Sequence, residues 1–131
     1  MTRQSTAEAM TSAPLAPVAA SIGAARRCVQ EFLVATPARA LAVEAGLVTT
    51  ELAANAARQS AAPFTVAASV EADCVRIAVS DDSAEAPELS AAAPSCAAAW
   101  GVERSAAGKT VWVAIPRSAA RCRTPRRRRR A

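Results

Sequence analysis

The sequence predicts an α+β two-layer sandwich in which helices pack on one face of a small mixed or antiparallel sheet. Three observations lead to this prediction. The first half of the chain repeats apolar residues at helical spacing, and the segments after residue 63 alternate with a period of two. The length of 131 residues suits one domain. We expect that domain to span residues 17–116.

Two helices are expected before residue 63. Residues 1–16 mix Ser, Thr, Ala and Pro without a period, which is typical of a disordered leader. The apolar spacing from residue 18 predicts a first helix that ends near residue 35, before Pro37. A second apolar stripe predicts a second helix that continues to about residue 60. The stripe consists of Leu41, Val48, Leu52 and Ala56.

The strands follow the helices. Residues 64–70 and 75–79 alternate apolar with smaller or polar side chains on either side of a turn at residues 71–73, which predicts a β-hairpin with one buried face. Residues 82–99 are rich in Ala, Ser, Pro and acidic residues and predict a loop or a weak helix. Residues 100–102 and 110–116 predict a closing pair of strands.

Composition and charge exclude several classes of function. The four Cys form no CxxC pair and the chain has no His, so a zinc site or a Cys-His nucleophile is not expected. No apolar run is long enough to cross a membrane and no secretory signal is visible, so we expect a cytoplasmic protein. Residues 117–131 hold eight of the 16 basic groups and no acid, which leaves residues 1–116 with a net charge of −3.

The basic charge therefore belongs to the tail, which we expect to be disordered over residues 117–131 because its like charges repel. Five consecutive Arg can bind nucleic acid by releasing counterions, without reading its sequence. A nucleic-acid accessory protein that acts through this tail is one alternative function. A solvated extension without function is the other interpretation of the tail.

Three short motifs carry candidate chemistry. Glu51, Asn55 and Gln59 lie four residues apart and so share one face of the second helix. Asp81 and Asp82 stand where a buried strand ends, and residues 108–110 (Gly-Lys-Thr) open the last strand. Taken singly, these motifs are also what a solvated helix face, a turn and a strand start contain.

Their order and spacing resemble a known family. Glu51-x-x-x-Asn55, then Val-Ser-Asp81-Asp-Ser83-x-x-x-Pro87, then Trp-Gly-Val-Glu and Gly-Lys-Thr110-Val-Trp are similar to the short ATP-binding domains of actinobacterial anti-sigma-factor serine kinases. These are relatives of the histidine kinase-like ATPase (Bergerat) fold. The resemblance spans about residues 24–116 and implies a truncated ATPase domain of this type.

The resemblance implies a role for each matched residue. Asn55 would bind Mg²⁺ through its side-chain oxygen, and Glu51 would act as general base. Asp81 would accept a hydrogen bond from the adenine amine, Thr110 would bind the same edge of the base, and Ser83 would contribute to the nucleotide site. The implied cofactors are ATP and Mg²⁺. The implied partners are a sigma factor and a phosphorylatable anti-sigma factor antagonist, and homodimers are common in the family.

One departure from the family pattern bears on activity. Residues 88–99 contain no Gly where family members carry a Gly-rich loop, and a Gln stands at position 59 in place of the usual His. Backbone amides exposed by such a loop bind phosphates. The sequence therefore predicts weak nucleotide binding and weakened or lost kinase activity, and a degenerate interaction module that no longer binds ATP is the first alternative.

Overall fold

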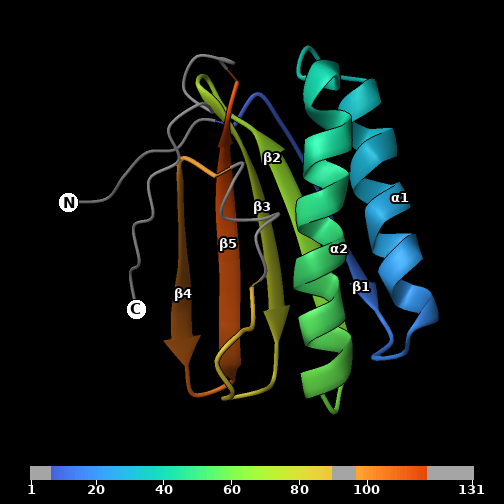
Figure 1. Ribbon diagram of the computed structural model, residues 1–131, viewed down its shortest axis with the longest axis vertical. Helices are drawn as coiled ribbons and strands as arrows, with labels where there is room; N and C mark the ends of the chain where they lie inside the picture. Colours follow the sequence, from blue (N-terminus) through green and yellow to red (C-terminus); the bar gives the residue numbers. More distant parts are fainter. Residues whose placement is uncertain (1–6, 90–96, 118–131) are drawn as a thin grey trace.

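The computed structural model describes residues 7–89 and 97–117, which form five strands and two α-helices. In chain order these are β1 (Ala9–Leu15), α1 (Ala20–Val34), α2 (Ala42–Gln59), β2 (Phe64–Val70), β3 (Cys74–Asp81), β4 (Ala99–Ser105) and β5 (Gly108–Pro116). A single 3-10 turn, Arg39–Leu41, precedes α2. Both helices lie against one side of the sheet (Figure 1), so the predicted two-layer α+β arrangement is confirmed.

The sheet is antiparallel at every described strand pair, in the order β1-β2-β3-β5-β4. The last strand, β5, is inserted between β3 and β4 (Figure 1), so it lies beside the strand that ends in Asp81. Because successive side chains of a strand point to opposite faces, this pairing decides which β5 residues face the helices.

The core lies between the helices and the sheet. Alternate residues of β2 and β3 are buried on the helix-facing side, as the two-residue period predicts. The largest fully buried side chains come from both layers and include Val29, Leu33, Val48, Leu52, Phe64, Ile77, Val113 and Ile115. On the opposite face, the guanidinium of Arg76 stacks 4.4 Å from the centroid of the Trp112 ring.

The expected leader is wrong for residues 9–15, which form an edge strand. β1 pairs with β2 along its whole length, from Ala9 opposite Val70 to Leu15 opposite Phe64. Its side chains alternate between half-buried and exposed, but Ala, Thr and Ser give too little contrast in hydrophobicity for the period to show. Pro14 lies within the strand, which is tolerated because β1 is at the edge of the sheet. Residues 1–6 lie outside the described part.

Arg117 belongs to the fold and not to the tail. Its backbone N–H donates to the carbonyl oxygen of Asp73 at 3.0 Å, and its Nη1 donates to that of Glu71 at 2.8 Å. The same nitrogen pairs with Glu8 Oε1 at 3.3 Å. Arg117 therefore ties the end of β5 to the β2–β3 turn and to the start of β1. The rest of the expected tail, residues 118–131, lies outside the described residues.

The two helices approach closely at Gly46. A Cβ at this position would meet the side chain of Gln30 on α1, and Gln30 Nε2 donates to the carbonyl oxygen of Ala42 at 3.1 Å. The Gln30 side chain thus lies in the space that a side chain at residue 46 would take. Neither helix of the described part combines the length and the apolar character needed to span a membrane.

Candidate functional site

The polar column of α2 forms one wall of the candidate site. Asn55 is 4% exposed; its Nδ2 donates to the carbonyl oxygen of Glu88 at 2.8 Å, and its Oδ1 accepts from Arg58 Nη2 at 2.6 Å. One turn later, Gln59 Nε2 donates to the carbonyl oxygen of Ala86 at 3.1 Å. The segment after β3 therefore crosses this face of α2 and is held there by side-chain amides. Glu51 is half-buried one turn before Asn55.

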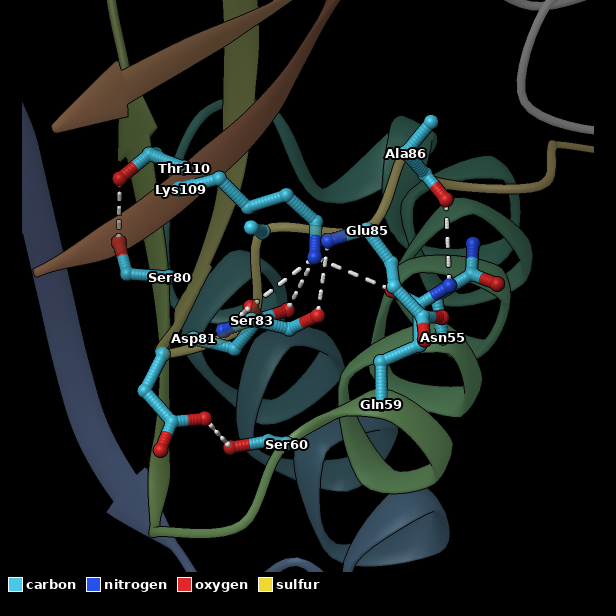
Figure 2. Close-up of polar contacts among 12 residues, drawn as sticks. Asn55, Gln59, Ser60, Ser80, Asp81, Ser83, Glu85, Ala86, Lys109 and Thr110 are labelled. Carbon is cyan, nitrogen blue, oxygen red and sulfur yellow. Dashed lines mark hydrogen bonds and ion pairs between the residues drawn. The ribbon is translucent and has the colours of Figure 1, made fainter. Parts of the chain in front are cut away.

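Asp81 forms the opposite wall, and its carboxylate is bound by Lys109. The Nζ atom of Lys109 donates to Asp81 Oδ1 at 3.0 Å and to Oδ2 at 3.1 Å, and the two side chains are 2% and 0% exposed for Asp81 and Lys109 respectively. Nζ also donates to Gln59 Oε1 at 3.1 Å. Figure 2 shows the Lys109 side chain extended from β5 across the space between the walls.

Sequence reasoning missed Lys109, although two signals pointed to it. It is the only Lys in a chain with 15 Arg. It also precedes Val111, Val113 and Ile115 at intervals of two, and these side chains are buried on the helix-facing side. Its cross-strand partner in β3 is Asp81 itself. The missing information was the pairing of β5 with β3.

Thr110 does not join this group. Because it follows Lys109 in the strand, its side chain points to the other face of the sheet, where its hydroxyl lies 2.7 Å from that of Ser80. Figure 2 shows this Ser80–Thr110 pair turned away from the Asp81 carboxylate. The expectation that Asp81 and Thr110 contact the same edge of a base is wrong in this arrangement.

Ser83 and Asp82 shape the turn after β3. The backbone N–H of Ser83 donates to Asp81 Oδ1 at 2.8 Å, and its hydroxyl accepts from the Glu85 N–H at 3.0 Å. Asp82 Oδ1 accepts from the Ser60 hydroxyl at 2.9 Å and from the Ala61 N–H at 3.1 Å. These hydrogen bonds lower the pKa of the Asp82 carboxyl from its usual 3.8. The turn is thereby fixed to the end of α2.

The donor set of the site does not fit Mg²⁺ or ATP in this arrangement. Asn55 Oδ1, the expected metal ligand, already accepts from a guanidinium cation, which would repel Mg²⁺. Asp81 Oδ1 accepts from the Ser83 N–H and from Lys109, and Oδ2 accepts from Lys109, so both carboxylate oxygens that an adenine amine would use already bind the ammonium. Across residues 7–89 and 97–117, no cluster of three or more His, Cys, Asp or Glu side chains is suited to a metal ion.

The described hollow of about 390 Å³ lies elsewhere, where the helix connector meets the end of β5. It is lined by residues that include Pro37, Leu41, Glu44 and Pro116. None of the expected site residues lines it, so it offers no alternative nucleotide pocket for Asn55 and Asp81.

Comparison with known proteins assigns no family. A scan against family models finds no match to the chain, and a search of the curated proteins finds none either. Nucleic-acid binding by the tail, a cytoplasmic location and a homodimer stay predictions.

Proposed function

We propose that this chain is a regulatory domain of the anti-sigma-factor serine kinase type that controls a sigma factor by protein binding, without kinase turnover. Its partners are a sigma factor, an anti-sigma factor antagonist, or both. ATP and Mg²⁺ are at most weak ligands of this domain. The proposal combines the family resemblance of the sequence with the chemical state of the site.

The arrangement of the motifs supports the resemblance. Gln59, the last residue of the polar column on α2, is joined to the Asp81 carboxylate by the Lys109 ammonium, which bonds to both. Helices on one face of an antiparallel sheet are compatible with the truncated ATPase domain that the resemblance implies. The helix motif and the acid at the end of β3 are therefore close in space, whereas Thr110 lies on the other face of the sheet.

One observation favours protein binding over phosphate transfer: the polar side chains of the site form hydrogen bonds and ion pairs with other residues of the chain. Asp81 is neutralised by Lys109, and Asn55 is held by Arg58 and by the Glu88 carbonyl. Phosphoryl transfer depends on metal ions and oriented donors around the phosphates. Asn55 and Asp81, the expected metal ligand and base acceptor, are both bonded to other groups of the protein, so this site supports neither metal binding nor the orientation of phosphates.

The test measures nucleotide and partner binding separately. Isothermal titration with Mg-ATP should give a dissociation constant of about 1 mM or weaker, and radiolabelled ATP should transfer no phosphate to the antagonist. Biolayer interferometry against sigma factors and antagonists encoded in the same genome should detect a partner whose binding is unchanged by ATP. Phosphate transfer that Glu51→Gln abolishes would refute the proposal, and so would binding to none of these proteins.

A further inference from the structure

The segment after β3 is bound to the rest of the fold through its backbone carbonyls. Three of these carbonyls, at alternate positions, each accept a hydrogen bond from a side chain. The three bonds join Ala84 to Arg104 Nη1 at 3.1 Å, Ala86 to Gln59 Nε2 at 3.1 Å, and Glu88 to Asn55 Nδ2 at 2.8 Å. Figure 2 shows the Ala86 carbonyl turned toward α2. In an extended chain the carbonyls of alternate residues point to the same side, so residues 84–88 are bound in the way that an extended peptide would be.

The spacing of the donors on α2 matches the spacing of these carbonyls. Asn55 and Gln59 are four residues apart, so their side chains leave the helix about 6 Å apart along its axis. Carbonyls two residues apart in an extended chain are separated by about 6.6 Å. The later donor binds the earlier carbonyl, so the segment runs antiparallel to the helix. One face of α2 is thus suited to bind the backbone of an extended segment, whatever its side chains are.

Cations fix the orientation of both side-chain amides. Asn55 Oδ1 accepts from Arg58 Nη2 at 2.6 Å, and Gln59 Oε1 accepts from Lys109 Nζ at 3.1 Å. Because a cation can only donate, each amide turns its oxygen toward the cation and its NH2 group toward the segment. Together with Arg104, these residues present donors to the segment, and we name them the donor surface: Asn55, Arg58, Gln59 and Arg104. Such a surface selects ligands that supply carbonyl and carboxylate oxygens.

Residues 84–89 are held on the donor surface by weak contacts. No backbone–backbone hydrogen bond joins them to another residue of the part of the chain that the structure describes. The Glu88 carboxylate lies 3.6 Å from Arg58 Nη2, but the two side chains are 83% and 55% exposed, and so exposed an ion pair contributes little. Leu89 is half-buried against the core. The segment lies between β3 and β4 and belongs to neither, so its release unpairs no strand.

We propose that the donor surface is a binding site for an extended acidic segment of a partner protein, and that residues 84–89 occupy this site until the partner segment replaces them. This inference rests on the proposed control by protein binding and names the chemistry of the partner. Alternate carbonyls of the partner segment bind Asn55 and Gln59, a carboxylate pairs with Arg58, and the apolar residue that follows takes the place of Leu89.

The experiment weakens the internal segment and measures binding of a peptide. The probe is a fluorescein-labelled peptide with the sequence of residues 83–89, blocked at both ends, and its binding is followed by fluorescence anisotropy. The Glu88→Lys variant should bind the probe at least threefold tighter than the wild-type protein, because its Lys is repelled by Arg58 whereas the probe keeps its carboxylate. The matched control is Glu85→Lys, which makes the same charge change at an exposed residue whose side chain contacts no residue of the donor surface.

Substitutions on the donor surface test which groups bind the probe. In the Glu88→Lys background, Gln59→Glu keeps an oxygen for Lys109 but replaces the NH2 donor by an acceptor that repels a carbonyl, so the gain in affinity should be lost. Arg104→Met, at a hydrogen bond exposed to solvent, removes another donor and should also reduce the gain. Circular dichroism verifies that each variant is folded.

Four results would overturn the inference: no gain in Glu88→Lys, an equal gain in Glu85→Lys, equal binding of a scrambled peptide, or a gain that survives both Gln59→Glu and Arg104→Met. The proposed function is tested separately, with sigma factors and antagonists on the wild-type protein. If the probe binds as expected but none of these proteins does, the proposed function fails and the peptide site stands. If a partner binds but the probe does not, only the peptide site fails.

Discussion

Breaking the Asp81–Lys109 pair should cost far more stability than a surface ion pair would. Both side chains are almost fully excluded from solvent, so removal of one partner leaves a buried charge without its counterion. Such a change costs about 3–5 kcal/mol. For a domain of this size, that loss lowers the melting temperature by roughly 10–20 °C. We therefore expect Asp81→Asn to destabilise the protein by this amount, even though the side chain keeps its shape.

The double variant distinguishes a charge effect from a packing effect. In Lys109→Met/Asp81→Asn both charges are absent, and replacing a buried pair by neutral groups of similar size is close to neutral. The double variant should thus be within about 1 kcal/mol of wild type and more stable than either single variant. Urea denaturation followed by circular dichroism and Trp fluorescence measures all four proteins.

Two results would refute this reasoning. A decrease in the free energy of unfolding of less than about 1 kcal/mol in Asp81→Asn is what an exposed ion pair gives. It would mean that the Lys109 ammonium is mostly exposed to solvent. Additive losses in the double variant would mean that each side chain stabilises the fold through separate contacts.

Three further predictions concern the ends of the sheet. Gly108→Ala should lower the free energy of unfolding by about 2 kcal/mol or more, because residue 108 has a φ of +143° and a Cβ would meet the Asp81 carbonyl oxygen; urea denaturation measures it. Burial, then the Glu71 and Asp73 carboxylates, raise the pKa of the Cys74 thiol from 9.0 to about 11. With the other Cys replaced by Ser, iodoacetamide should therefore alkylate Cys74 at a rate that rises with pH up to about pH 11. The free energy of unfolding that comes from keeping this thiol neutral should be fully present below pH 9 and should decline above it. Deleting residues 118–131 should leave the melting temperature unchanged, whereas a deletion that includes Arg117 should lower it.

The secondary structure was largely predictable because side-chain periodicity is local. The apolar spacing gave α1 and α2 to within a few residues, and the alternation after residue 63 gave β2 and β3. β1 was missed because its Ala, Thr and Ser side chains are nearly alike in hydrophobicity. β1 is held by its pairing with β2, whose residues lie 49 to 61 positions later in the chain, and such a distant partner gives no local signal in the sequence.

The candidate site was predictable only where it depends on one helix. The spacing of Asn55 and Gln59 places them on one face of α2, and both do contact the segment after β3. The roles of Lys109 and Thr110 depend on the register between β3 and β5, which are separated by β4 in sequence. A shift of one residue exchanges the two faces of a strand, so the motif Gly-Lys-Thr alone does not show which side chain points to Asp81.

The ion pair between Arg117 Nη1 and Glu8 Oε1, at 3.3 Å, places the two ends of the described fold side by side. Chain ends this close allow circular permutation. A chain that joins the end of β5 to the start of β1 by a short linker, with new termini in the exposed β4–β5 turn, would keep every strand pair. In such a permutant Lys109 would follow a free amino end, and the mobility of the first residues of β5 could be varied by the length of that end alone.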